Sequence, residues 1–149
     1  MLTNIRTTRI EWCDCDPAGI IFYPRYFEMT NSVVENFFAE VLAYPYARIT
    51  LDEGCGVPTV RIEANFKAPS RLGERVEFAL EVLRLGGASV GFLLTARCGD
   101  EIRLTADLTL VWVDQTGKAK PWPAEIRSAL TAFISSAGTT TLLLPLVAC

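Results

Sequence analysis

The sequence predicts an α+β protein in which one antiparallel sheet of about five strands is wrapped around one long helix. A single stretch after Pro24 repeats apolar residues at helical spacing over a wide face. Most of residues 57–113 instead alternates apolar and polar side chains, as half-buried antiparallel strands do. The 149 residues can bury one core, and we expect a single domain over residues 1–135.

The N-terminal part supplies the first strand and the helix. Residues 3–12 are expected to form the strand, and the Asp, Pro and Gly residues of 13–19 a turn. Pro24 suits the first turn of the helix, for which we expect roughly twenty residues. Its apolar positions are Tyr26, Phe27, Val33, Val34, Phe37, Phe38, Val41 and Leu42. So many apolar positions indicate a deeply buried helix.

The remaining strands follow one another along the chain. They are expected at residues 57–66, 74–85, 89–98 and 102–113. Gly86-Gly87 and Gly99-Asp100 form tight turns between the last three, which makes these strands antiparallel neighbours. A short second helix is expected at residues 121–135, and residues 136–149, which carry no charge, are read as a tail of uncertain order.

Composition excludes several classes of function. The 14 basic and 17 acidic residues give a net charge of -3, which is unlike a protein that binds nucleic acid through phosphate contacts. No apolar run approaches the roughly 20 residues that span a bilayer, so we expect no membrane segment. The N-terminus has no secretory signal pattern, and the five cysteines are an odd number at irregular positions. These features favour the cytoplasm and reduced thiols.

The absence of histidine limits the chemistry that the chain can perform. It removes the usual general base, the usual partner of a nucleophilic Ser or Cys, and the commonest zinc ligand. Cys13 and Cys15 alone are a weak metal motif, and packing explains them better. We therefore expect neither a metal nor an organic cofactor.

Asp14 and Asp16 are the candidate catalytic groups. Both lie in the turn that leads to the start of the long helix, where free N–H groups and the positive end of the helix dipole can hold an oxyanion. A carboxylate beside such a place can attack an activated ester or activate water. The alternative is that both residues only stabilise the turn and cap the helix.

Three stretches of the sequence resemble the 4-hydroxybenzoyl-CoA thioesterase family, whose fold is the hotdog fold. They read IEWCDCDPAGIIFYPRY at residues 10–26, GVPT at 56–59 and FKAPSRLGE at 66–74. The resemblance implies an acyl-CoA thioesterase with an aromatic acyl group and with Asp16 as nucleophile or general base. It also implies a homodimer or a dimer of dimers, because hotdog sheets pair edge to edge.

The same resemblance implies the residues that bind substrate. The backbone N–H of Tyr23 would hold the oxyanion, and Gly19 would let the backbone approach the substrate. Asn31 would meet the far end of the acyl group, where a 4-hydroxybenzoyl-specific member has an aspartate. From its helix position alone, Asn31 could instead make a structural hydrogen bond. Further contacts would come from Tyr46, Pro58, Thr59, Arg84 and Ser89.

The sequence departs from the family at the turn between the strands at 74–85 and 89–98. Well-known members have a basic cluster there for the CoA phosphates, whereas this chain has Gly86-Gly87-Ala88-Ser89 with only Arg84 nearby. Thioesters of acyl carrier protein or of short and medium acyl groups therefore remain alternatives. So does a non-catalytic domain that binds an acyl group. A hydratase of the same fold would need a histidine, which this chain lacks.

Overall fold

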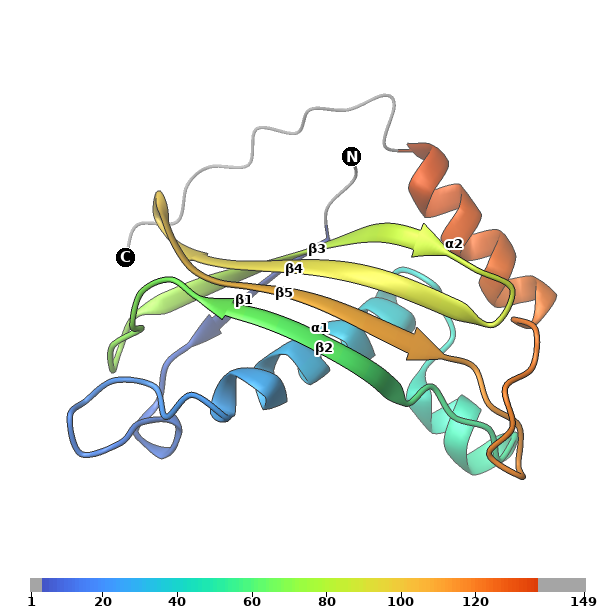
Figure 1. The fold of residues 1–149 in the computed structure, drawn as a ribbon, viewed down its shortest axis with the longest axis horizontal. Helices are drawn as coiled ribbons and strands as arrows, with labels where there is room; N and C mark the ends of the chain where they lie inside the picture. The colour runs from blue at the N-terminus through green and yellow to red at the C-terminus, as the bar shows by residue number, and fades with distance from the viewer. Residues whose placement is uncertain (1–3, 137–149) are drawn as a thin grey trace.

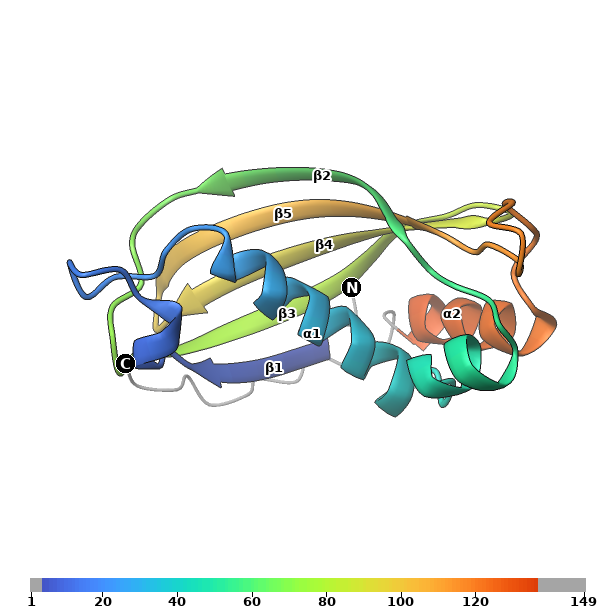
Figure 2. The same cartoon turned by 90° about the horizontal axis from the view of Figure 1, so that it is seen from below.

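The computed structural model describes residues 4–136, which form an antiparallel sheet curved around a long helix (Figures 1 and 2). The strands are β1 (Asn4–Arg9), β2 (Thr59–Phe66), β3 (Arg75–Leu85), β4 (Ser89–Cys98) and β5 (Glu101–Val111). The helices are α1 (Arg25–Glu40) and α2 (Ala124–Ser136), and two short helical turns are η1 (Trp12–Asp14) and η2 (Arg48–Asp52). The predicted hotdog architecture is confirmed.

The strand order places β2 at one edge of the sheet. The order is β1-β3-β4-β5-β2, and all neighbours are antiparallel. Tight turns connect β3, β4 and β5, whereas β2 follows η2 beyond the C-terminal end of α1 and lies beside β5 (Figure 2). The outer edge of β2 has no partner strand within residues 4–136, so its backbone groups are available to another chain.

The core lies between α1 and the concave face of the sheet. Alternate residues of β3, β4 and β5 point inward, and they meet the apolar face of α1. Phe37 of α1 is fully buried, and its ring lies 5.5 Å from that of Phe92 in β4 and 5.0 Å from that of Phe133 in α2. These contacts fix the axis of α1, and with it the place where the helix begins.

Several element boundaries differ from those predicted, for local reasons. β1 ends at Arg9 because the chain then turns into η1, where Asp14 accepts a hydrogen bond from the Glu11 N–H. α1 has 16 residues because Ala43 takes a left-handed conformation (φ 53°) and Pro45 follows. The turn η2 was not predicted, since its five residues are too few to show a helical period.

The described part of the chain ends with α2 at Ser136. The expected tail at 136–149 therefore lies almost wholly outside the described residues, and the domain boundary at 135 stays a prediction. No helix within residues 4–136 has the length and hydropathy to cross a membrane.

Candidate active site

Asp16 begins a tight turn in the loop before α1. Its carbonyl accepts the Gly19 N–H at 3.0 Å, and its own N–H donates to the Ile20 carbonyl at 3.0 Å. Asp, Pro and Gly stand at the positions that type I turns favour for them, and Gly19 adopts a φ of 78° that suits glycine. The sequence therefore fixes this turn locally, and the conformation of Gly19 is a sufficient reason for a glycine there.

The turn holds the Asp16 carboxylate in one orientation. Oδ1 accepts the Ala18 N–H at 2.8 Å, while Oδ2 makes no hydrogen bond to any residue that the structure describes. The side chain is half-buried. One oxygen of Asp16 thus stabilises the turn, and the other is available for a ligand.

Asp14 has a different position in the same loop. Its Oδ2 accepts the Glu11 N–H at 2.9 Å, and its carbonyl accepts the Phe22 N–H at 3.0 Å. Between these two aspartates, Cys15 forms an antiparallel bridge with Ile21 and packs against the core. Asp14 is therefore engaged in closing the loop, and Asp16 is the better candidate for chemistry.

The start of α1 contributes one free backbone donor. The N–H groups of Arg25, Tyr26 and Phe27 each donate to the carbonyl three residues earlier, at 2.9 to 3.1 Å. The Tyr23 N–H has no hydrogen-bond acceptor among residues 4–136. Its side chain is 60% exposed, and the ring stands edge-on to Phe66 of β2 at 5.8 Å. The Tyr23 N–H, which is the predicted oxyanion donor, is thus free to donate a hydrogen bond to a ligand.

A cavity of about 350 Å³ lies between α1, β2 and β5, and it brings together two predicted substrate residues, Asn31 and Thr59. Asn31 makes no hydrogen bond within the described part of the chain, so the structural role considered for it is not observed there. The apolar lining residues are Phe27, Val34, Ile62 and Leu108, and Glu28 and Thr30 add two more polar side chains. Sequence reasoning missed Glu28 in this cavity, although it precedes Asn31 by three residues and shares its helix face.

Tyr46 and Pro58 lie in the segment that connects the C-terminal end of α1 to β2. The Tyr46 ring packs on Phe38 at 5.3 Å, and burial, with a smaller effect from Glu35, raises the pKa of its phenol. Pro58 precedes β2, and its carbonyl accepts the Val111 N–H at 3.1 Å. Neither residue lines the cavity within one protomer.

Arg84 and Ser89 lie at the far end of the sheet from Asp16. The 11 residues of β3 separate the two ends, which corresponds to roughly 30–35 Å of extended chain. The Ser89 carbonyl accepts the Trp122 indole N–H at 3.0 Å, so this residue helps to anchor the segment before α2. In one protomer the structure does not bring Arg84 or Ser89 to the Asp16 loop.

Arg84 is engaged with a carboxylate on the outer face of the sheet. Its Nη1 and Nη2 donate to Asp107 at 3.2 and 2.7 Å, and this pairing lowers the pKa of Asp107. The side chain crosses Gly91 of β4, where a Cβ atom would lie 2.5 Å from Arg84 Nη2. Gly91 therefore makes room for the pair, a role that the strand pattern did not reveal.

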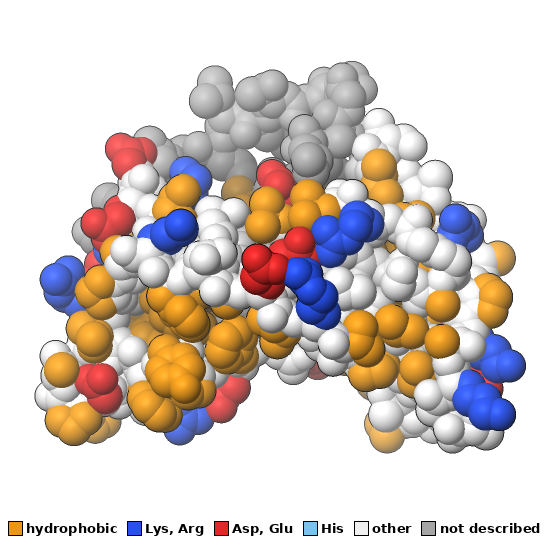
Figure 3. All heavy atoms as spheres, in the orientation of Figure 1, with side chains coloured by type: hydrophobic (Ala, Val, Ile, Leu, Met, Phe, Trp, Pro, Cys, Tyr) orange, Lys and Arg blue, Asp and Glu red, His pale blue; other side chains and the backbone are white. Residues whose placement is uncertain are grey.

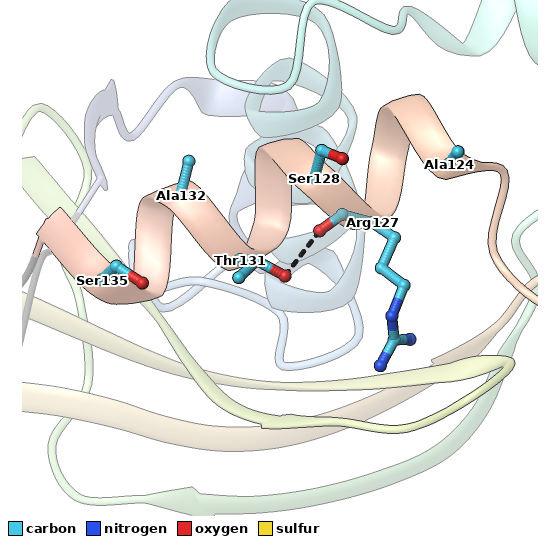
Figure 4. A pocket seen from close by; sticks show the side chains of 6 residues that line it. All are labelled: Ala124, Arg127, Ser128, Thr131, Ala132 and Ser135. Atoms are coloured by element: carbon cyan, nitrogen blue, oxygen red, sulfur yellow. Dashed lines mark hydrogen bonds between the residues drawn. The ribbon is translucent and has the colours of Figure 1, made fainter.

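A second groove, of about 510 Å³, follows the exposed side of α2 (Figure 4). None of the predicted site residues lines it; its lining residues are Ala124, Arg127, Ser128, Thr131, Ala132 and Ser135. The Thr131 hydroxyl donates to the Arg127 carbonyl at 2.8 Å, and Arg127 Nη1 donates to the Gly86 carbonyl at 2.9 Å. The Arg127 guanidinium and the Thr131 hydroxyl are thus used within the protein, so this groove is the weaker candidate.

Cys13, Cys15 and Cys55 are free thiols, and Cys15 and Cys55 make contacts within their loops. Cys15 Sγ donates to the Glu11 carbonyl at 3.4 Å, and burial raises the pKa of its thiol. Among residues 4–136, no group of three His, Cys, Asp or Glu side chains could hold a metal ion.

Comparison with known proteins identifies the family. The family model described as the thioesterase-like superfamily matches residues 10–130. The chain belongs to this superfamily. A stretch of 59 residues is 36% identical to the 4-hydroxybenzoyl-CoA thioesterase of Pseudomonas sp. (strain CBS-3), and it spans 39% of this chain and 42% of that enzyme. The resemblance inferred from the sequence is confirmed.

Solved structures share the fold of this thioesterase-like chain. A gentisyl-coenzyme A thioesterase superposes with a TM-score of 0.77 at 24% identity, over 85% of this chain and 99% of that one. A 1,4-dihydroxy-2-naphthoyl-CoA thioesterase from Synechocystis gives a TM-score of 0.78 at 16% identity, over 87% and 96% of the two chains. These two likenesses support the fold.

The ion pair between Arg84 and Asp107 on the outer face of the sheet predicts that two substitutions have a coupled effect on stability. Gly91→Ala should push the Arg84 guanidinium off Asp107 and lower the free energy of unfolding. In an Arg84→Ala background the same change should be neutral or stabilising, because alanine suits a strand interior better than glycine. Urea unfolding of the four proteins measures the coupling, and equal effects in both backgrounds would contradict it.

Proposed function

We propose that this chain hydrolyses a CoA thioester of a compact aromatic acid, with Asp16 as the reacting carboxylate and the Tyr23 N–H as the oxyanion donor. One observation carries the proposal. The loop before α1 holds a carboxylate with one free oxygen and, a few residues on, a backbone amide with no acceptor among residues 4–136. Membership of the thioesterase-like superfamily supports the same reaction.

Two chemical routes fit these groups. In the first, Asp16 Oδ2 attacks the thioester carbonyl, the Tyr23 N–H stabilises the oxyanion, and the C–S bond breaks to give an anhydride that water then hydrolyses. In the second, Oδ2 takes a proton from the water that attacks the carbonyl. A thiolate leaves readily in both routes, since thiols such as cysteine have a pKa of about 8.5. No histidine is needed, and the chain has none.

The cavity beside α1 supports a compact acyl group. Asn31 lies six residues beyond Arg25, or roughly 9 Å along the helix axis, which suits the reach of one substituted ring from the start of the helix. The Pseudomonas relative and the gentisyl-CoA thioesterase are named for aromatic acyl groups, which supports the same class here. Thr59 would contact the ring, and Gly19, Tyr46 and Pro58 stay predicted contacts.

A thioester of an acyl carrier protein is the second candidate carrier. Arg84, the cation expected to meet the CoA phosphates, already pairs with Asp107, and the turn at 86–89 has no charged side chain. This weakens the prediction that Arg84 and Ser89 bind the nucleotide. Comparing kcat/KM for one acyl group on CoA and on pantetheine decides the point, because a nucleotide contact would favour CoA.

The assembly that we propose is a homodimer, alone or within a dimer of dimers, formed through the edge of β2. This strand is exposed on both faces, and large apolar side chains remain exposed on it and on the loop before α1: Val60, Ile62 and Phe66 on the strand, and Phe22 and Tyr23 on the loop. In Figure 3 hydrophobic side chains gather along the lower part of the face on which Figure 1 places β2. A partner strand would cover them and close the open side of the cavity.

Asp16→Asn should lower kcat for aryl-CoA hydrolysis by about a thousandfold or more, because the amide keeps the turn but cannot attack or accept a proton. Asp14→Asn is the control, since its amide oxygen can still accept the Glu11 N–H. Thiol release from benzoyl-CoA and 4-hydroxybenzoyl-CoA, without added metal, is the measurement, and circular dichroism checks the fold. Near-normal turnover of Asp16→Asn would mean that Asp16 is not the reacting carboxylate, and Asp14 would be tested next.

Asn31→Asp should shift specificity toward 4-hydroxybenzoyl-CoA relative to benzoyl-CoA. A carboxylate only accepts hydrogen bonds and suits a phenol, whereas the native amide also donates. Matching one hydrogen bond in a site from which the bound substrate excludes water is worth about 1–3 kcal/mol, or roughly ten- to a hundredfold in the ratio of kcat/KM values. An unchanged ratio would mean that Asn31 does not contact the acyl group.

The wild-type protein should sediment as a dimer or larger at micromolar concentration, also after truncation following Ser135. Val60→Glu, which places a charge on the exposed edge strand, should shift it toward the monomer. Ile134→Glu is the matched control, because Ile134 is an exposed apolar residue of α2. A monomeric wild type in analytical ultracentrifugation would refute the proposed assembly.

A further inference from the structure

The loop between β2 and β3 lies directly against the Asp16 turn. The Ser70 carbonyl accepts the Ile21 N–H at 2.9 Å, and the Leu72 N–H donates to the Gly19 carbonyl at 2.9 Å. The buried Ser70 hydroxyl is also 2.7 Å from the Tyr26 phenol oxygen in the first turn of α1. Residues 67–74 therefore hold both ends of the segment that carries Asp16 and the Tyr23 amide.

The side chain and backbone of Arg103 in β5 hold the loop of residues 67–74 in place. Its Nη1 donates to the Pro69 carbonyl at 2.9 Å and to Glu74 Oε1 at 3.1 Å, and its Nη2 donates to Glu74 Oε2 at 2.8 Å. The Arg103 carbonyl accepts the N–H groups of Lys67 and Ala68 at 2.8 and 3.3 Å. One residue thus contacts the beginning, the middle and the end of the loop.

The burial of Arg103 strengthens these hydrogen bonds. The residue is only 5% exposed, so few water molecules compete for its donors. The hydrogen bond from Arg103 is the main cause that lowers the pKa of Glu74, whose Oε1 also accepts the Arg71 N–H at 2.5 Å. Glu101 Oε1 adds an ion pair 2.6 Å from Arg103 Nε, without the alignment of a hydrogen bond.

We propose that Arg103 is a positioning residue for the reaction, because it fixes the loop on which the Asp16 turn and the start of α1 rest. This inference rests on the proposed function of Asp16 and Tyr23. The chain of contacts runs from Arg103 through Pro69 and Glu74 to Ser70 and Leu72, and from these to the catalytic segment. The guanidinium reaches the Pro69 carbonyl and both Glu74 oxygens because its donors lie on two nitrogens in a fixed plane. The three donors of a lysine ammonium share one nitrogen and do not match this spacing.

The experiment compares Arg103→Lys with Arg48→Lys, a matched control. Arg48 also donates to both oxygens of a glutamate, Glu125, at 3.3 and 3.2 Å, but it does so where η2 meets α2. Hydrogen exchange of the full-length protein is followed by NMR at the Ile21 and Leu72 amides, with Leu94 of β4 as the internal reference. Steady-state kinetics on the best aryl-CoA substrate are measured in parallel.

In Arg103→Lys the Ile21 and Leu72 amides should exchange about tenfold faster or more, while Leu94 stays within about twofold of wild type. The kcat should fall by roughly ten- to a hundredfold with a nearly unchanged KM, because displacing reacting groups by about an ångström costs that much while the cavity that binds the acyl group remains. Arg48→Lys should change neither the exchange of these amides nor kcat.

Two results would overturn the inference. The first is wild-type exchange at Ile21 and Leu72. The second is faster exchange at Leu94 to the same degree, which would mean that Arg103 only stabilises the whole fold. If Arg103→Lys does not fold, Glu74→Gln is measured in the same way, because it keeps the shape of the side chain and removes the charge. If the wild type hydrolyses no acyl-CoA, the proposed function fails, and the exchange data alone still decide whether Arg103 fixes the turn.

Discussion

The burial of one face of α1 in the concave side of the sheet is the constraint on which the rest of the structure depends. Phe37 and Phe38 are fully buried, so the helix cannot slide or rotate without leaving voids in the core. Its first turn is therefore fixed at one end of the sheet, beside the loop that follows β2. Its exposed side faces β2, where the cavity lined by Asn31 is found. A single packing interaction thus places both the reacting end and the acyl end of the candidate site.

A fixed helix does not by itself place the Asp16 carboxylate, since that residue lies on the preceding loop. The turn conformation comes from local sequence, because Pro17 and Gly19 restrict it to few alternatives. The position of the turn comes from residues distant in sequence, through the hydrogen bonds to Ser70 and Leu72. Local preferences give the carboxylate its orientation within the turn, and the loop that Arg103 holds gives the turn its location in the molecule.

The difference between local preferences and contacts distant in sequence explains what could be predicted from the sequence. The strand and helix periods gave the fold, and the Asp-Pro-Ala-Gly turn indicated where a carboxylate meets the helix. Arg103 could not be recognised, because it alternates with buried Leu104 along β5 and so has the pattern of a residue that faces solvent. Arg84 seemed available to a ligand, since the strand pattern did not show that its side chain reaches Asp107 across Gly91. Contacts between residues distant in sequence leave little trace in local periodicity.

The hydrogen bonds of the loop before α1 also separate polar groups that have a partner from those available to a ligand. A buried or half-buried polar group without a partner costs stability, so most such groups in a folded protein are satisfied. Asp14 is bonded through both its carboxylate and its carbonyl, and the amides of Arg25 and Tyr26 are bonded as well. Asp16 Oδ2 and the Tyr23 N–H, an acceptor and a donor only a few residues apart, have no partner within residues 4–136. In the reaction that we propose, the oxygen of a thioester carbonyl would accept the Tyr23 amide hydrogen while its carbon lies against Asp16 Oδ2.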